Sequence, residues 1–117
     1  MIRSPYTVTV LAFLATVAAG CGFPPAGAVP PPVTAADADA AKARFPDSSE
    51  ASLNEGRDLF ASHCNRCHNY PDVRKIEEGR WPDILSRMGK KANLDDSQVR
   101  AVLTFVLVVR SQAAKLR

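Results

Sequence analysis

The run Cys64-Asn65-Arg66-Cys67-His68 restricts what this chain can be more than any other feature of its sequence. Two cysteines separated by two residues and followed directly by a histidine form the pattern to which a c-type haem is attached. Each thiol adds across one vinyl group of the porphyrin, and the short spacing places both sulfur atoms on one edge of the ring. The next side chain, His68, is then carried under the iron as an axial nitrogen ligand. The motif therefore predicts one covalently bound haem c per chain, held by Cys64, Cys67 and His68.

Two other uses of paired cysteines fit this sequence less well. A redox-active dithiol usually lies on a βαβ scaffold, and the chain shows no alternating strand pattern. A structural zinc site needs four ligands, commonly from two separated pairs. Here the only histidines, His63 and His68, flank a single cysteine pair, and four ligands crowded into six consecutive residues are poorly placed to surround one ion. Haem attachment is the interpretation that the sequence favours.

Length and charge exclude further classes. The 117 residues suffice for one small domain. The formal net charge is +3, and charges of both signs are interspersed along the chain. A nucleic-acid-binding protein would need its Lys and Arg residues clustered on one face, so we expect no nucleic-acid partner.

The first 20 residues are predicted to be a signal peptide. Arg3 supplies a short positive region, and residues 6–20 form an apolar run without charge. At about fifteen residues this run is shorter than the roughly 20 needed to span a bilayer. It fits the apolar region of a secretory signal, which ends in small residues.

The signal ends at Ala18-Ala19-Gly20-Cys21, which resembles the lipobox of bacterial lipoproteins. That resemblance implies that Cys21 carries the lipid and becomes the first residue of the mature protein, although leucine is more typical at the position of Ala18. The alternative is ordinary signal cleavage nearby, with Cys21 a spare thiol. Lipidation also accounts for the one cysteine that the haem motif leaves over. We therefore expect a periplasmic (extracytoplasmic) protein anchored to a bacterial membrane.

Residues 21–47 are predicted to be a tether and residues 48–117 the folded domain. The tether is rich in Pro and Ala, and its prolines disfavour both helix and sheet. Such a composition is typical of a semi-rigid spacer. Within it, residues 35–43 could form a transient helix.

Helical patterns follow in the domain. A first helix is expected over residues 49–62, with Ser48 or Ser49 as its cap and Gly56 allowing another backbone to approach closely. A second begins at Trp81-Pro82 and ends near Gly89. A third is capped by Asp95, with Gln98 completing a capping box, and continues with apolar residues at helical spacing. These are Val99, Val102, Leu103, Val106 and Leu107, widened by Phe105 and Val109.

Taken together, these segments resemble a class I c-type cytochrome domain over about residues 49–112. The resemblance is carried by Gly56-Arg57-Asp58-Leu59-Phe60, the haem motif, Met88 and the last helix with Phe105. It implies an all-α fold of three to four helices around one haem, with the first and last helices crossing near Gly56, Phe60 and Phe105. It also implies one-electron transfer as the activity. The sequence departs from the family in the short interval between His68 and Met88, and in a methionine that is expected on a helix.

Met88 is the expected second axial iron ligand, because Met1 is removed with the signal peptide and Met88 is then the only methionine in the sequence. A thioether opposite histidine raises the reduction potential of the iron. The alternative is that it fills a gap in the core. His63 directly precedes Cys64, on the side of His68, so we expect a solvated residue at a helix end. Trp81 is the best candidate to contact a haem propionate, since its N–H can donate while its ring packs.

The expected function is that of an electron carrier between a redox donor and a redox acceptor, not an enzyme. The sequence shows no signature of a general base, a nucleophile or a substrate pocket. One alternative is a haem-based sensor or peroxidase-like protein with an open sixth iron position. Another is a haem subunit fixed to a dehydrogenase or oxidase, suggested by the broad apolar face of residues 102–109. We expect the chain to be a monomer or a subunit of a redox complex.

Overall fold

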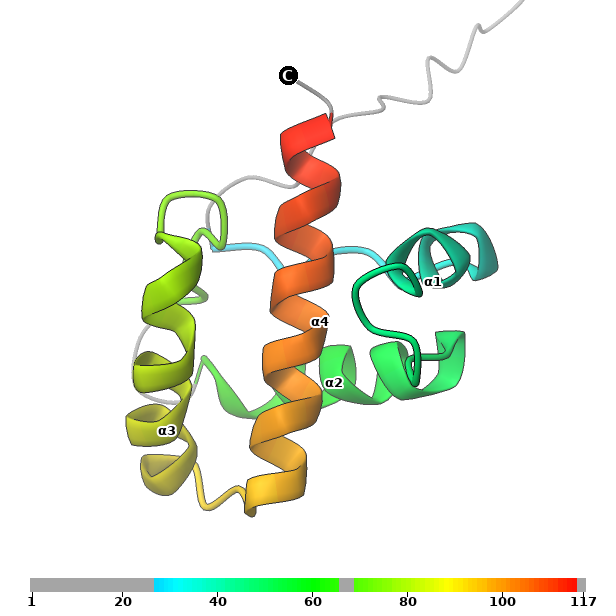
Figure 1. Cartoon of the computed structure of the whole chain (residues 1–117). Coiled ribbons are helices and arrows are strands. Elements are labelled where there is room, and N and C mark those ends of the chain that lie inside the picture. Colours follow the sequence, from blue (N-terminus) through cyan, green and yellow to red (C-terminus); the bar gives the residue numbers. More distant parts are fainter. Residues whose placement is uncertain (1–26, 66–68, 116–117) are drawn as a thin grey trace, which may run out of the picture.

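The computed structural model describes residues 27–65 and 69–115, and all regular structure within these ranges is helical (Figure 1). The elements in chain order are α1 (Ala35–Ala41), α2 (Glu50–His63), the short 3-10 helix η1 (Glu78–Arg80), α3 (Trp81–Lys91) and α4 (Asp96–Lys115). The predicted all-α class is therefore confirmed. None of the helices in the described ranges is both long enough and apolar enough to cross a membrane.

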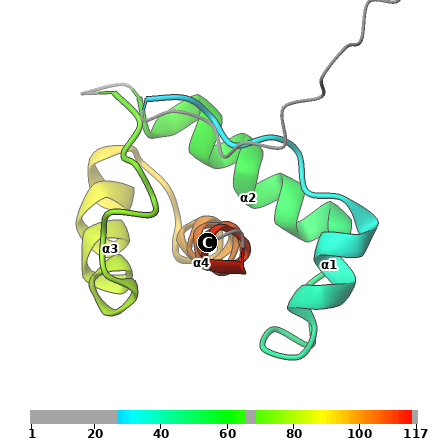
Figure 2. The ribbon, with the colours of Figure 1, turned by 90° about the horizontal axis from the view of Figure 1, so that it is seen from above.

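Helix α4 is the centre of the arrangement. Viewed along its axis, it has α3 on one side and α2 with α1 on the other (Figure 2). Val102, Phe105 and Val106 have no exposed surface, so the wide apolar face of α4 is used inside the protein. The predicted capping box is present, because Asp95 N–H donates to Gln98 Oε1 and Gln98 N–H donates to Asp95 Oδ1, each at 2.9 Å.

Helices α2 and α4 cross at Gly56. A Cβ atom at this position would collide with the carbonyl group of Ala101 and would lie 2.9 Å from Cβ of Phe105. One turn further along α2, the ring of Phe60 packs against that of Phe105 with 5.9 Å between centroids. The close approach predicted at Gly56 is confirmed, and it lets the two backbones meet without an intervening side chain.

The residues before α2 pack onto the domain. Val33 and Ala38 are buried, with 5% and 3% of their surface exposed. Thr34 caps α1 in a capping box with Asp37. Ser49 caps α2, whereas the hydroxyl of the buried Ser48 donates to the carbonyl oxygen of Phe45 at 2.7 Å. The described part of the predicted tether thus has its own helix and contributes to the core.

Helix α3 continues two residues beyond the predicted end near Gly89. A Cβ atom at Gly89 would collide with a methyl group of Val99, so this glycine serves the packing of α3 on α4. The helix ends at Lys91, and Asn93, two residues later, has a φ of 60° in the left-handed region that asparagine tolerates. Leu94 N–H then donates to Gly89 O at 2.9 Å.

Candidate cofactor site

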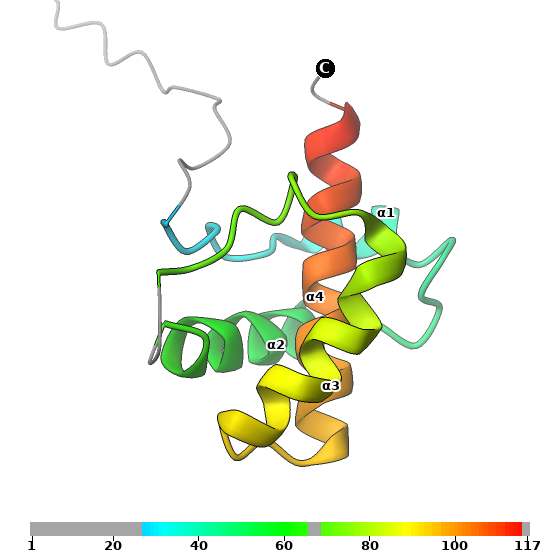
Figure 3. The same ribbon diagram turned by 90° about the vertical axis from the view of Figure 1, so that its left-hand side faces the viewer.

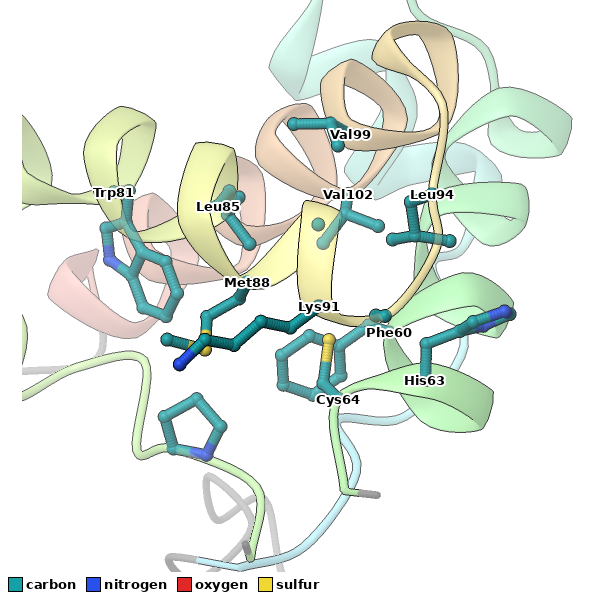
Figure 4. Close-up of a pocket in the computed structure, with 13 residues that line it drawn as sticks. Phe60, His63, Cys64, Trp81, Leu85, Met88, Lys91, Leu94, Val99 and Val102 are labelled. Atoms are coloured by element: carbon teal, nitrogen blue, oxygen red, sulfur yellow. The ribbon is translucent and has the colours of Figure 1, made fainter. Parts of the chain in front are cut away.

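An apolar hollow lies where the end of α2, the length of α3 and the first turns of α4 face one another (Figure 4). It contains about 690 Å³ of space free of protein atoms, part of it open to solvent. Its lining residues are Phe60, His63, Cys64, Pro71, Trp81, Leu85, Met88, Gly89, Lys91, Ala92, Leu94, Val99 and Val102.

The hollow brings together two of the predicted site residues. Cys64 directly follows α2, and its N–H donates to Phe60 O at 3.0 Å as the C-cap of that helix. Met88 is half-buried on α3. Figure 4 shows both sulfur atoms directed into the hollow from these two elements. The other predicted residues, Cys67, His68 and Cys21, lie outside the residues that the structure describes.

The Cys64 thiol is held in its neutral form. Burial removes water from the sulfur and raises its pKa from 9.0 to about 11. Reactive dithiols and zinc-binding cysteines need the thiolate, which an apolar surrounding disfavours. The environment of Cys64 therefore agrees less well with a reactive dithiol than with a sulfur in an apolar site.

Trp81 lines the hollow with its ring and carries an unsatisfied donor that is buried beside it. Its side chain is 1% exposed, and its Nε1 has no hydrogen-bond partner among the described residues. A buried donor without a partner costs about 1–3 kcal/mol. An acceptor bound in the hollow would remove that cost.

The remaining polar side chains of the lining are His63 and Lys91. His63 is the last residue of α2, as expected, but it is half-buried rather than solvated. Its Nδ1 lies 2.7 Å from Ser62 Oγ and 3.2 Å from Leu59 O, and its ring extends away from Met88 (Figure 4). Lys91 is the only cation of the described lining, and its side chain reaches along the hollow toward Met88.

The loop after residue 68 closes one side of the hollow through Pro71. The Tyr70 hydroxyl donates to the carbonyl oxygen of Ala61, and its ring stacks on Phe60 at 5.4 Å. The Asp72 carboxylate, 6% exposed, accepts from the backbone N–H of Arg74 at 3.0 Å and from its guanidinium at 2.9 and 2.8 Å. This contact lowers the pKa of Asp72. The Tyr-Pro-Asp sequence is typical of a turn, but it does not indicate these anchoring contacts.

The residues present fit a haem. A porphyrin is a large ring with apolar faces, and the hollow offers an apolar lining that includes the ring of Trp81. Cys64 would hold the ring edge at the end of α2, and Met88 would face the iron from α3. No family model, curated protein or solved structure matches this chain.

Proposed function

We propose that this chain is an exported, lipid-anchored monohaem c-type cytochrome that carries single electrons between redox proteins. One observation carries the proposal: Cys64 of the attachment motif and Met88 of a separate helix face the same apolar hollow. If the C-x-x-C-H motif occurred by chance, there would be no reason to find the thioether of Met88 on the opposite wall of the hollow. The proposed role is that of a carrier and not of an enzyme.

In this proposal Cys64 and Cys67 hold the porphyrin covalently, His68 is one axial ligand and Met88 is the other. The bound haem supplies a reversible one-electron exchange between ferrous and ferric iron. The protein positions the group and tunes its potential. Its apolar lining disfavours the additional positive charge of the oxidised state, and Met88 acts in the same direction.

The surrounding helices keep this geometry fixed. Phe60 belongs both to the α2–α4 crossing and to the lining of the hollow, so the site is built directly on that crossing. A rigid site changes little when the iron gains or loses an electron. Trp81 would donate its N–H to a haem carboxylate and so orient the ring.

The test is the spectrum of the protein produced in a host that matures c-type cytochromes. Ferric haem with methionine ligation gives a weak charge-transfer band at the red end of the visible spectrum. We expect this band in the wild type and its loss in both Met88→Ala and Met88→Leu, with a lower reduction potential. The leucine variant retains the side-chain volume, so the loss would report the thioether itself.

Ile84→Ala is the matched control, since Ile84 is half-buried on α3 but does not line the hollow. This variant is expected to keep the band. A wild-type protein that lacks the band and binds carbon monoxide readily would favour the sensor or peroxidase-like alternative instead.

A further inference from the structure

We infer that the segment of residues 27–48 is docked along α2 and holds the anchored end of the chain beside the cofactor site, so that this edge of the protein faces the membrane. The inference rests on the proposed function for the presence of the lipid and the haem. The inference goes beyond the proposed function in two ways. The spacer between the lipid and the domain is short rather than long, and the partner is a redox protein at the bilayer surface.

The first contact is a pair of hydrogen bonds made by Asn54 on α2. Val33 N–H donates to Asn54 Oδ1 at 2.8 Å, and Asn54 Nδ2 donates to Val33 O at 2.9 Å. One amide side chain thus satisfies both backbone groups of a residue that is only 5% exposed. This is the pairing that a neighbouring strand would provide, and it fixes the segment at Val33.

The second contact gives the segment its direction. Arg57, one turn further along α2, donates from Nε to Pro30 O at 2.8 Å. As the chain is followed from Val33 back to Pro30, its contact moves along α2 from Asn54 to Arg57. The segment therefore runs antiparallel to α2, and its beginning lies toward the helix end that carries Cys64. Figures 2 and 3 both show the beginning of the described chain beside the loop that resumes at Asn69.

The other end of the segment is also held. The guanidinium of Arg44 pairs with Glu78, whose second carboxylate oxygen lies 3.9 Å from Arg110 of α4. Phe45 packs against the core between these contacts and α2. Both ends are thus attached to the domain, and the segment cannot act as a free spacer while these contacts persist.

Chain length then limits how far the domain can move from its anchor. From Cys21 to Gly27 there are six residues, which span at most about 20 Å. A free spacer from Cys21 to Asp47 would reach roughly 80 Å when extended. With the segment docked, the end of α2 and its Cys64 remain near the bilayer, within reach of a membrane-embedded redox partner and not of one far from the surface.

Attraction between charged side chains and lipid headgroups does not set the orientation of the protein on the membrane. The described charged side chains near the end of α2 and the following loop are balanced, with Arg57 and Arg74 beside Asp58 and Asp72. The orientation is therefore expected to be insensitive to salt, unlike the docking of a basic face on anionic lipid.

The test uses the full-length, haem-bearing lipoprotein in vesicles of neutral lipid that contain a fluorescent headgroup, which haem quenches at short range. We expect strong quenching by the wild type at low and high salt. The double variant Asn54→Ala/Arg57→Ala should lose at least about half of it, while haem absorption stays unchanged. Glu55→Ala is the matched control, because Glu55 is an exposed neighbour on the same helix. Equal quenching by the double variant and the wild type would overturn the inference.

A second measurement separates this inference from the proposed function. Amide hydrogen exchange at Val33 needs neither haem nor lipid, and it should be slow in the wild type and accelerated at least tenfold in Asn54→Ala. Fast exchange in a wild-type protein that carries haem would defeat the docking alone. A protein without haem absorption, or one that does not associate with vesicles, would defeat the proposed function instead, and the exchange at Val33 would still report the docking.

Discussion

Helix α2 meets the rest of the protein in two neighbouring regions that have similar chemistry and opposite packing. At its middle, Gly56 brings the backbone against Ala101 so closely that not even a methyl group would fit. At its end, Phe60 and Cys64 border a hollow of about 690 Å³. Both regions are apolar, and the same two helices, α2 and α4, contribute to each.

The difference agrees with the proposed cofactor site, because the hollow is open to solvent and lined with apolar side chains. Protein interiors rarely leave voids larger than a water molecule. The crossing is packed this tightly, so apolar side chains could have filled the neighbouring hollow as well. The lining instead carries two sulfur atoms and an unsatisfied indole N–H. The crossing is complete by itself, whereas the hollow is where we propose that the cofactor binds.

The largest effect is expected at the crossing. Gly56→Ala places a methyl group against the Ala101 carbonyl and Phe105, and neither backbone can yield without separating the helices. We expect a loss of about 3 kcal/mol in the free energy of unfolding, measured with denaturant. Gly79→Ala is the matched control, since nothing lies within 4 Å of the added Cβ there, and its change should stay within about 0.5 kcal/mol. Similar values for the two variants would refute the tight crossing.

In the hollow, the reactivity of Cys64 should report its dry surroundings. With a pKa of about 11 against 9.0 for an ordinary thiol, the folded chain without haem should be alkylated at Cys64 about a hundredfold more slowly at pH 8 than the unfolded chain. The rate should rise about tenfold per pH unit up to about pH 11. Alkylation is followed at each cysteine by mass spectrometry. Equal rates in folded and unfolded chains would place Cys64 in water.

Trp81→Phe should destabilise the haem-bearing form more than the haem-free form. The loss of ring volume destabilises the protein both with and without haem. The difference between the two losses of unfolding free energy therefore reports the contribution of the N–H. Without haem, removal of the unsatisfied donor offsets part of that loss. With haem, a hydrogen bond is lost, and the variant should be destabilised by about 1 kcal/mol more than in the haem-free form. Equal losses of unfolding free energy in both forms would remove Trp81 from the site.

The smallest effect is expected in the loop that closes the hollow. Asp72→Asn removes the carboxylate that binds Arg74 and should cost about 1 kcal/mol of stability at neutral pH. Because the contact with Arg74 lowers the pKa of Asp72 in the folded protein, the ionised carboxylate stabilises the fold above its unfolded pKa. That contribution is lost as the pH falls through the folded pKa. The melting temperatures of variant and wild type should therefore converge in acid, and a difference that persists there would have another origin.

Much of the crossing could be predicted from the sequence, because its signals are local. Asp95 with Gln98 predicted a helix start, and Gly56 predicted a close approach, since each residue has a specific backbone role. The docked segment could not be predicted in the same way. It is held by Asn54 and Arg57, two polar side chains that bind backbone groups 21 and 27 residues away and leave no periodic pattern in the sequence. The hollow lies between these cases: Met88 was expected to face the site, but its extent depends on how three helices meet.

The most direct test of the central claim is the intact mass of the denatured protein after production in a host that matures c-type cytochromes. The account predicts the mass of the processed chain plus one haem, with the colour remaining on the protein in acidified organic solvent. A bare polypeptide mass, or pigment released into the solvent, would contradict it.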